Sequence, residues 1–242
     1  MVVPKYGSKV SIIIPSYEYN GKGVYYLSHI FRTISKQTLK DVEVIVPDHS
    51  IDDKIEEFCS DNIFDLNIVY VRNSDSRGNA AVNKNVGMDI AKGEIVKMMY
   101  MDDFFFRDDS LEKIYNALTT SEKMWLVCGT NHTRDDGKTF DTVIYPRWND
   151  NMLKARGNNT MSGVSVISYK NQDMNIRWDP NTCMLMDIDF YYQLRNKFGD
   201  CLYLNEVLIS QRVNVDALSS ITSDQDIQKE FVYCREKFGI QI

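Results

Sequence analysis

The sequence predicts an α/β fold in which a mostly parallel central sheet is flanked by helices, within a single domain that covers residues 1–242. Through about residue 130, short β-branched runs alternate with helical patterns, as in βαβ units. A chain of 242 residues and 28.1 kDa matches one large domain, which can bury its core without disulfides or a structural metal. No internal repeat, low-complexity tract or linker divides it.

The first part of the chain should supply the centre of the sheet. Apolar residues at three- and four-residue spacing predict helices around residues 27–34, before Phe58, and over 81–90. We expect Gly93 to end the last of these helices in a left-handed conformation. The strands expected between the helices cover residues 10–14, 42–46, 67–71 and 95–101. The last strand is apolar almost throughout, which is typical of a central strand buried on both faces.

Beyond residue 130, polar stretches separate shorter elements. We expect strands at residues 164–168, 201–204 and 207–210. A helix should begin near Asp187, and an amphipathic helix over about residues 226–238 should close the chain.

Composition excludes several classes of protein. A net charge of -6 and a pI near 5.2 argue against nucleic acid as a partner, because such affinity requires clustered Lys and Arg. No stretch approaches the roughly 20 apolar residues of a spanning helix, so we expect no membrane span and a cytoplasmic location. Five cysteines without a C-x-x-C pair indicate neither a zinc site nor a disulfide framework.

Polar side chains follow four successive strands of the predicted sheet. Ser16 and Tyr17 follow the first, Asp48 the second, Arg77 the third, and Asp102 with Asp103 the fourth. Ligands of open parallel sheets bind outside the carboxyl ends of the strands, so this edge is the expected site. For Arg77, an exposed loop arginine is an equally good interpretation.

The strongest single feature is the pair Asp102 and Asp103 in MMYMDDFFF. Two adjacent carboxylates beside an apolar strand repel each other unless a cation or hydrogen-bond donors compensate. Mg2+ or Mn2+ takes one or two carboxylates together with diphosphate oxygens. The alternative is that both aspartates cap the helix that follows.

Three motifs in order then resemble the family 2 glycosyltransferases, which have the GT-A fold with its Rossmann-like sheet. The segments are KVSIIIPSYEYN, SKQTLKDVEVIVPDHSIDD and NSDSRGNAAVNKNVGMDIAKGEIVKMMYMDD, and they cover roughly residues 8–110. The resemblance implies that residues 8–110 form a nucleotide-sugar-binding half and residues 111–242 an acceptor-binding half. It also implies an enzyme that transfers a sugar.

The resemblance also assigns roles to single residues. Asp48 would accept a hydrogen bond from the nucleobase of the donor, and Asp102 would contact ribose or metal. Asp103 would be the direct ligand of Mn2+ or Mg2+. The other residues expected to bind the nucleotide sugar are Pro15, Ser16, Tyr17, Glu18, Arg77, Lys84 and Arg212, of which Lys84 replaces the usual arginine.

In the second half, TCMLMDIDFYYQLR resembles the family segment that supplies the catalytic base. Asp187 is the expected base and Asp189 the alternative, since positions two apart on a helix do not share a face. A helix cap is the competing interpretation of Asp187. QRVNVDALSS resembles a further motif that makes Arg212 a candidate for the diphosphate, with Ser219 and Ser220 as weaker candidates.

The expected reaction is metal-dependent and inverts the anomeric carbon. The donor would be a UDP, GDP or dTDP sugar, and the acceptor a glycan or another hydroxyl compound; the oligomeric state stays open. Several aromatics could stack on acceptor sugars: Phe104 to Phe106, Trp148, Trp178, Tyr191 and Tyr192. One alternative is a catalytically inactive nucleotide-sugar binder, because Met101 and Met186 depart from the family pattern. Another is a sugar nucleotidyltransferase, although PSYEYN lacks that class's Gly- and Lys/Arg-rich loop.

Overall fold

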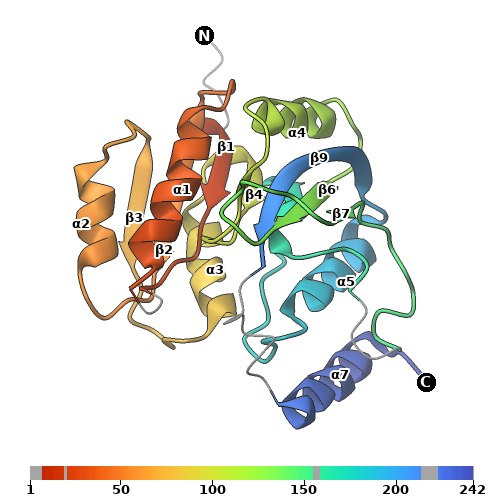
Figure 1. The fold of residues 1–242 in the computed structure, drawn as a ribbon. Helices are drawn as coiled ribbons and strands as arrows, with labels where there is room; N and C mark the ends of the chain where they lie inside the picture. Colours follow the sequence, from red (N-terminus) through yellow and green to blue (C-terminus); the bar gives the residue numbers. More distant parts are fainter. Residues whose placement is uncertain (1–6, 19–20, 155–158, 214–222, 242) are drawn as a thin grey trace.

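The computed structural model describes residues 7–18, 21–154, 159–213 and 223–241. Within them, nine strands form one mixed sheet in the order β3-β2-β1-β4-β8-β6-β9-β5, with β7 paired to β6 (Figure 1). The strands are β1 (Ser8–Ile13), β2 (Val42–Asp48), β3 (Ile68–Arg72), β4 (Gly93–Met98), β5 (Phe104–Phe105), β6 (Trp125–Thr133), β7 (Val143–Ile144), β8 (Ile167–Lys170) and β9 (Leu202–Arg212).

Helices lie between these strands along the chain, and a last helix follows β9. They are α1 (Gly23–Ser35), α2 (Lys54–Asp61), α3 (Ala80–Ile90), α4 (Ser110–Thr119), α5 (Met186–Phe198) and α7 (Asp224–Phe238), with a short 3-10 turn, η1 (Val164–Val166), before β8. The expected mostly parallel sheet between helices is confirmed, since β1, β2, β3, β4, β6 and β9 all run the same way. None of the described helices is both long enough and apolar enough to cross a bilayer.

The order of the first four strands reverses between β1 and β4. From β1 the chain moves outward through β2 to β3, and then returns through α3 to pair β4 with the other side of β1. Ligands of open α/β sheets bind at such a reversal, beyond the carboxyl ends of the two strands. In this chain those ends lead to Ser16 and Tyr17 on one side and to Asp102 and Asp103 on the other.

The predicted role of Gly93 is wrong. Helix α3 ends at Ile90, and Gly93 is the first residue of β4 rather than a left-handed cap. A Cβ atom at Gly93 would lie 2.3 Å from the backbone nitrogen of Ser11, so the glycine is required for the close approach of two strands. The fourth strand therefore starts and ends earlier than the expected residues 95–101.

The second half differs more from the predictions. The two strands expected at 201–204 and 207–210 are one strand, β9, whose pairing with β6 shifts register around Gly129. Residues 164–168 divide between η1 and β8. The closing helix is confirmed as α7, which lies beside α5 at the lower right of Figure 1.

Candidate active site

The first side of the site is built where β1 and β2 end. An isolated parallel bridge joins Ser16 to Asp48, and the backbone N–H of Ser16 donates to the carbonyl of Pro47 over 2.8 Å. Ser16 is buried, and its hydroxyl donates to the carbonyl of Ile14. Pro15 is half-buried, whereas Tyr17 is 46% exposed at the rim of this corner.

Asp48 lies at the bottom of this corner and is completely buried. Its Oδ1 accepts hydrogen bonds from the backbone N–H and the hydroxyl of Ser50, at 2.8 and 2.5 Å. Its Oδ2 accepts from the hydroxyl of Tyr70 at 2.9 Å. A carboxylate that accepts this many hydrogen bonds is held in one orientation. A ligand that bound Asp48 would have to approach it past Ser50 and Tyr70.

Two buried carboxylate oxygens beside Asp48 have no hydrogen-bond partner among the described residues, Oε2 of Glu18 and Oδ1 of Asp52. Glu18 is joined to this corner, because its backbone N–H donates to the hydroxyl of Ser50 at 2.7 Å. A buried acceptor without a donor costs about 1–3 kcal/mol, so this corner is suited to a ligand that brings N–H or O–H groups.

Behind the corner lies a buried amide and imidazole network. Nε2 of His49 lies 2.8 Å from Nδ2 of Asn73, and Asn83 donates to the carbonyl of Pro47 at 2.9 Å. The Asn73 amide is the donor, so Nε2 of His49 is the acceptor in this pair. Burial lowers the pKa of His49, with a further contribution from Arg77 nearby. Arg77 itself is exposed in its loop, as the alternative interpretation predicted.

Asp102 and Asp103 follow β4 and do not cap a helix, because the chain continues into β5 and α4 begins only at Ser110. Asp103 is 4% exposed, and its Oδ1 accepts the backbone N–H of Arg212 at 3.1 Å. Burial, followed by the charge of Asp102, raises the pKa of Asp103 well above its ordinary value. Asp102 is more exposed than Asp103 and lies closer to solvent.

Arg212 holds this aspartate turn against β9 instead of extending into solvent. Its Nε donates to the carbonyl of Asp102 at 3.0 Å, and its guanidinium pairs with Asp136. A second guanidinium nitrogen lies 2.9 Å from Nδ1 of His29, whose ring stacks on Phe104. With only 9% of its surface exposed, Arg212 has its donors directed at groups within the chain.

Asp187 lies in the first turn of α5 and faces the end of β4. The N-cap of α5 is Leu185, so Asp187 is not the cap that the competing interpretation assumed. The hydroxyl of Tyr100 donates to Oδ1 of Asp187 at 3.1 Å. Burial raises the pKa of Asp187, and this is opposed by the charge of Lys84 and by the Tyr100 hydrogen bond. A Cβ at Gly163 would lie 3.9 Å from Oδ2 of Asp187, which places the Gly163 backbone beside this oxygen.

Lys84 is completely buried behind Asp187 and is not on the surface of the site. Its ammonium group donates to the hydroxyl of Tyr100 at 3.3 Å and lies 4.3 Å from the ring centre of Trp178. Burial lowers the pKa of Lys84 to about 8, although the charge of Asp187 acts in the opposite direction. Lys84, Tyr100 and Asp187 therefore form one chain of polar contacts from the core to the site.

Asp189 faces away from this site. It is completely buried, and its Oδ1 accepts from Nζ of Lys237 in α7 at 2.6 Å, while Oδ2 accepts from Gln193 at 2.6 Å. The two aspartates thus lie on different faces of α5, as their spacing predicts. Asp187 is the one directed toward the end of β4.

The structure brings Asp103, Tyr100 and Asp187 together, since the backbone N–H of Asp103 donates to the carbonyl of Tyr100 at 3.2 Å and the hydroxyl of Tyr100 donates to Asp187. Tyr100 and Gly163 were not identified from the sequence, although the position of Tyr100 two residues before Asp102 was an available signal. Trp178 and Tyr191 are only 1% exposed, so they are core residues and not sugar platforms. Ser219 and Ser220 lie outside the described residues.

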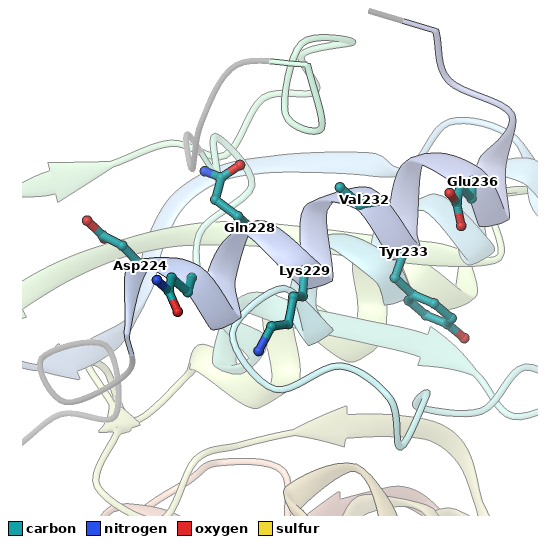
Figure 2. Close-up of a pocket in the computed structure, with 7 residues that line it drawn as sticks. Asp224, Gln228, Lys229, Val232, Tyr233 and Glu236 are labelled. Carbon is teal, nitrogen blue, oxygen red and sulfur yellow. The ribbon is translucent and has the colours of Figure 1, made fainter.

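A surface hollow of about 700 Å³ runs along α7 (Figure 2). The described residues that line it all belong to that one helix: Asp224, Gln225, Gln228, Lys229, Val232, Tyr233 and Glu236. It is the outer face of α7 and contains none of the site residues.

Comparison with known proteins agrees with this architecture. The sequence profile described as "Glycosyl transferase family 2" matches residues 11–179. The chain is 29% identical over 133 residues to glycosyltransferase GlyG of Streptococcus pneumoniae serotype 4. That match covers 54% of this chain and 42% of the relative, so less than half of the relative's length is represented.

Solved structures share the fold at low sequence identity. S. aureus TarS, residues 1–349 in complex with UDP-GlcNAc, superposes with a TM-score of 0.69 at 14% identity, over 93% of this chain and 66% of TarS. The mannosyltransferase PcManGT from Pyrobaculum calidifontis, in complex with GDP-Man and Mn2+, superposes with a TM-score of 0.62 at 16% identity, over 88% of this chain and 59% of that chain. These structures establish the GT-A fold.

Proposed function

Because the chain belongs to glycosyl transferase family 2, we propose that it transfers a sugar from a nucleoside diphosphate to a hydroxyl acceptor with inversion of the anomeric carbon. The observation that carries this proposal is the position of Asp187, whose carboxylate accepts the hydroxyl of Tyr100 while the carbonyl of Tyr100 accepts the N–H of Asp103. A base and a group of carboxylates for a diphosphate site then occupy the same edge of the sheet.

The donor site that we propose lies beyond the carboxyl ends of β1 and β4. Asp48, the unpartnered oxygen of Glu18 and the exposed ring of Tyr17 would receive the nucleobase and ribose. Support comes from TarS, which is described with UDP-GlcNAc, and from PcManGT, which is described with GDP-Man. The donor is accordingly a nucleoside diphosphate sugar of the UDP, GDP or dTDP type.

The carboxylates of Asp102 and Asp103 fit a Mg2+ or Mn2+ ion that also binds the donor. Asp102 raises the pKa of the buried Asp103, and a cation would relieve this repulsion. Within the described ranges, no three His, Cys, Asp or Glu side chains gather closely enough to hold a metal by themselves. The ion that we propose would be held by one or two carboxylates and completed by diphosphate oxygens. When bound, the ion would neutralise charge on the departing diphosphate.

The chain's own residues would act on the acceptor. Asp187 takes the proton of the acceptor hydroxyl while that oxygen forms a bond to the anomeric carbon, and the bond from this carbon to the diphosphate oxygen breaks on the opposite side. The hydrogen bond from Tyr100 orients the carboxylate of Asp187. Lys84 favours the charged form of Asp187, the form that can accept a proton.

We also propose that residues 8–110 bind the donor and residues 111–242 bind the acceptor. A cytoplasmic location is a further part of the proposal. Arg77 is free of the core and could approach the base or the diphosphate. Arg212 would support the diphosphate site by holding the Asp102–Asp103 turn through its contacts to both residues.

The test is turnover of UDP-N-acetylglucosamine and GDP-mannose, each with and without Mn2+, measured as release of the nucleoside diphosphate and as product stereochemistry. We expect metal-dependent release with an inverted product and its loss in Asp187→Asn. Binding of UDP or GDP without any turnover would favour the inactive binder. Formation of a nucleotide sugar from a nucleoside triphosphate and a sugar phosphate would favour the nucleotidyltransferase.

A further inference from the structure

Helix α7 lies against the segment that leads into α5, the helix that carries Asp187 (Figure 1). Its buried side packs through Phe231 and Cys234, while Glu230 and Lys237 make the polar contacts to that segment. None of these residues belongs to the proposed donor site beyond β1 and β4. Their effect on the site would therefore be exerted through α5.

Glu230 binds the backbone directly before α5. Its Oε2 accepts hydrogen bonds from the N–H groups of Cys183, Met184 and Leu185, at 3.0, 2.9 and 2.9 Å. Bonds from N–H groups to a charged acceptor are roughly twice as strong as neutral ones. Leu185, the N-cap residue, has no side-chain acceptor of its own. Glu230 therefore supplies, from another helix, the acceptor that the N-cap residue of α5 lacks.

Lys237 binds the residues on either side of that backbone segment. Its ammonium group lies 2.6 Å from Oδ2 of Asp179 and 2.6 Å from Oδ1 of Asp189. Tyr233 also donates to Oδ2 of Asp179 at 2.7 Å. Although burial acts in the opposite direction, the hydrogen bonds from Lys237 and Tyr233 lower the pKa of Asp179 to about 2. Burial raises the pKa of Asp189, and the hydrogen bond and charge of Lys237 oppose this.

Together these contacts bracket Asp187. Glu230 fixes the chain up to two residues before it, and Lys237 fixes Asp189 two residues after it. Between these two anchors, the carboxylate of Asp187 accepts the hydrogen bond of Tyr100. We propose that Glu230 and Lys237 are positioning residues that set the place of the Asp187 carboxylate, so that α7 governs turnover without contacting the donor. This inference rests on the proposed function of Asp187 as the base.

The test compares Glu230→Ala, Glu230→Gln and Lys237→Met with matched controls on the same helix, Lys229→Ala and Glu236→Ala. Lys229 and Glu236 lie on the outer face of α7 in Figure 2, and the Lys229 side chain is 76% exposed. A misplaced carboxylate slows turnover, with about 100-fold lost for a displacement of roughly 1 Å. We expect Glu230→Ala to lower kcat for release of the nucleoside diphosphate at least ~10-fold. The Kd for UDP or GDP should stay within about twofold of wild type.

The Glu230→Gln variant separates positioning from folding, because its carbonyl oxygen can still accept the three N–H groups. We expect it to recover most of the kcat lost in Glu230→Ala. Hydrogen exchange gives a readout independent of activity: the amides of Cys183, Met184 and Leu185 should exchange faster in Glu230→Ala and remain protected in Lys229→Ala.

Three results would overturn the inference: kcat unchanged in folded Glu230→Ala and Lys237→Met, an equal loss in the two controls, or a parallel loss of UDP and GDP affinity. If Asp187→Asn abolishes turnover while the α7 variants do not, only the positioning role fails. If Asp187→Asn leaves turnover intact, the proposed base fails and the positioning role fails with it.

Discussion

The hydroxyl of Tyr100 donates a hydrogen bond of 3.1 Å to Oδ1 of Asp187, and so joins the end of β4 to the first turn of α5. These residues are 87 positions apart in the sequence, and their contact brings the two halves of the chain to one site. Of the two aspartates, Asp187 faces the end of β4 and Asp189 faces α7, so substitutions of the two residues should have different effects.

The first prediction separates the two aspartates of α5. Asp187→Asn keeps the shape of the side chain and removes its basicity, so we expect turnover to fall at least ~100-fold, within the range of general base catalysis. Kd for UDP or GDP should stay near wild type. Asp189→Asn removes the charged partner of Lys237, so we expect a lower Tm and a loss of turnover no greater than that in Lys237→Met. Steady-state kinetics and thermal melts measure both effects, and a loss of turnover larger in Asp189→Asn than in Asp187→Asn would reverse the assignment.

The second prediction concerns the metal. EDTA should abolish turnover, and Mn2+ or Mg2+ should restore it. Because a ligand of the folded state raises Tm, Mn2+ with UDP should shift the melting temperature of wild type but not of Asp103→Asn. Without metal, Asp103→Asn should be at least as stable as wild type, since burial and Asp102 both disfavour the charged carboxylate. Full turnover in metal-free protein would contradict the roles given to Asp102 and Asp103.

The third prediction concerns the nucleobase. Asp48→Ala should weaken UDP or GDP binding by about 1–3 kcal/mol, the cost of an unsatisfied buried partner. It should also lower stability, because Tyr70 and Ser50 lose their acceptor. Tyr70→Phe is the matched control, since it removes one donor to Asp48 and leaves the carboxylate in place. Calorimetric titration distinguishes the variants, and equal affinity in wild type and Asp48→Ala would place the base elsewhere.

The fourth prediction is a pH dependence of stability from Lys84. Its pKa is about 8 in the folded chain against an ordinary 10.5, so between these values the unfolded chain binds more protons. The free energy of unfolding contributed by this group therefore rises with pH through that window. Relative to Lys84→Met, wild type should gain about 2 kcal/mol between pH 7 and pH 10. Urea denaturation measures the difference, with the exposed Lys229→Met as control; a difference that does not change with pH would contradict the prediction.

Local patterns predicted the first half of the fold well. The strands expected at residues 10–14, 42–46 and 67–71 correspond to β1, β2 and β3, because β-branched runs between turn residues determine both their type and their place. The prediction for Gly93 was wrong because the residue serves a tertiary contact. Its lack of a Cβ allows the close approach of Ser11, whereas the local sequence pattern indicated a helix cap.

The candidate site was predicted by position more than by contact. Strand ends located Asp48, Asp102 and Asp103, and helix spacing separated Asp187 from Asp189. The contacts of Lys84, Arg212 and Glu230 could not be predicted in this way. Each depends on a partner more than 40 residues distant, and no local pattern in the sequence specifies that partner.

The strand order also has a consequence for synthesis on the ribosome. Strands β3, β2, β1 and β4 are neighbours in the sheet and are all complete once Met98 has emerged, so they can pair early. Strands β5 and β6 are made next. Strand β5 pairs with β9, and β6, apart from a short pairing with β7, pairs with β8 and β9, which end only at Lys170 and Arg212. Until then the free edges of β4 and β6 are exposed, and exposed edges promote aggregation of nascent chains. Chaperone demand should therefore be greatest while residues 133–170 are being translated.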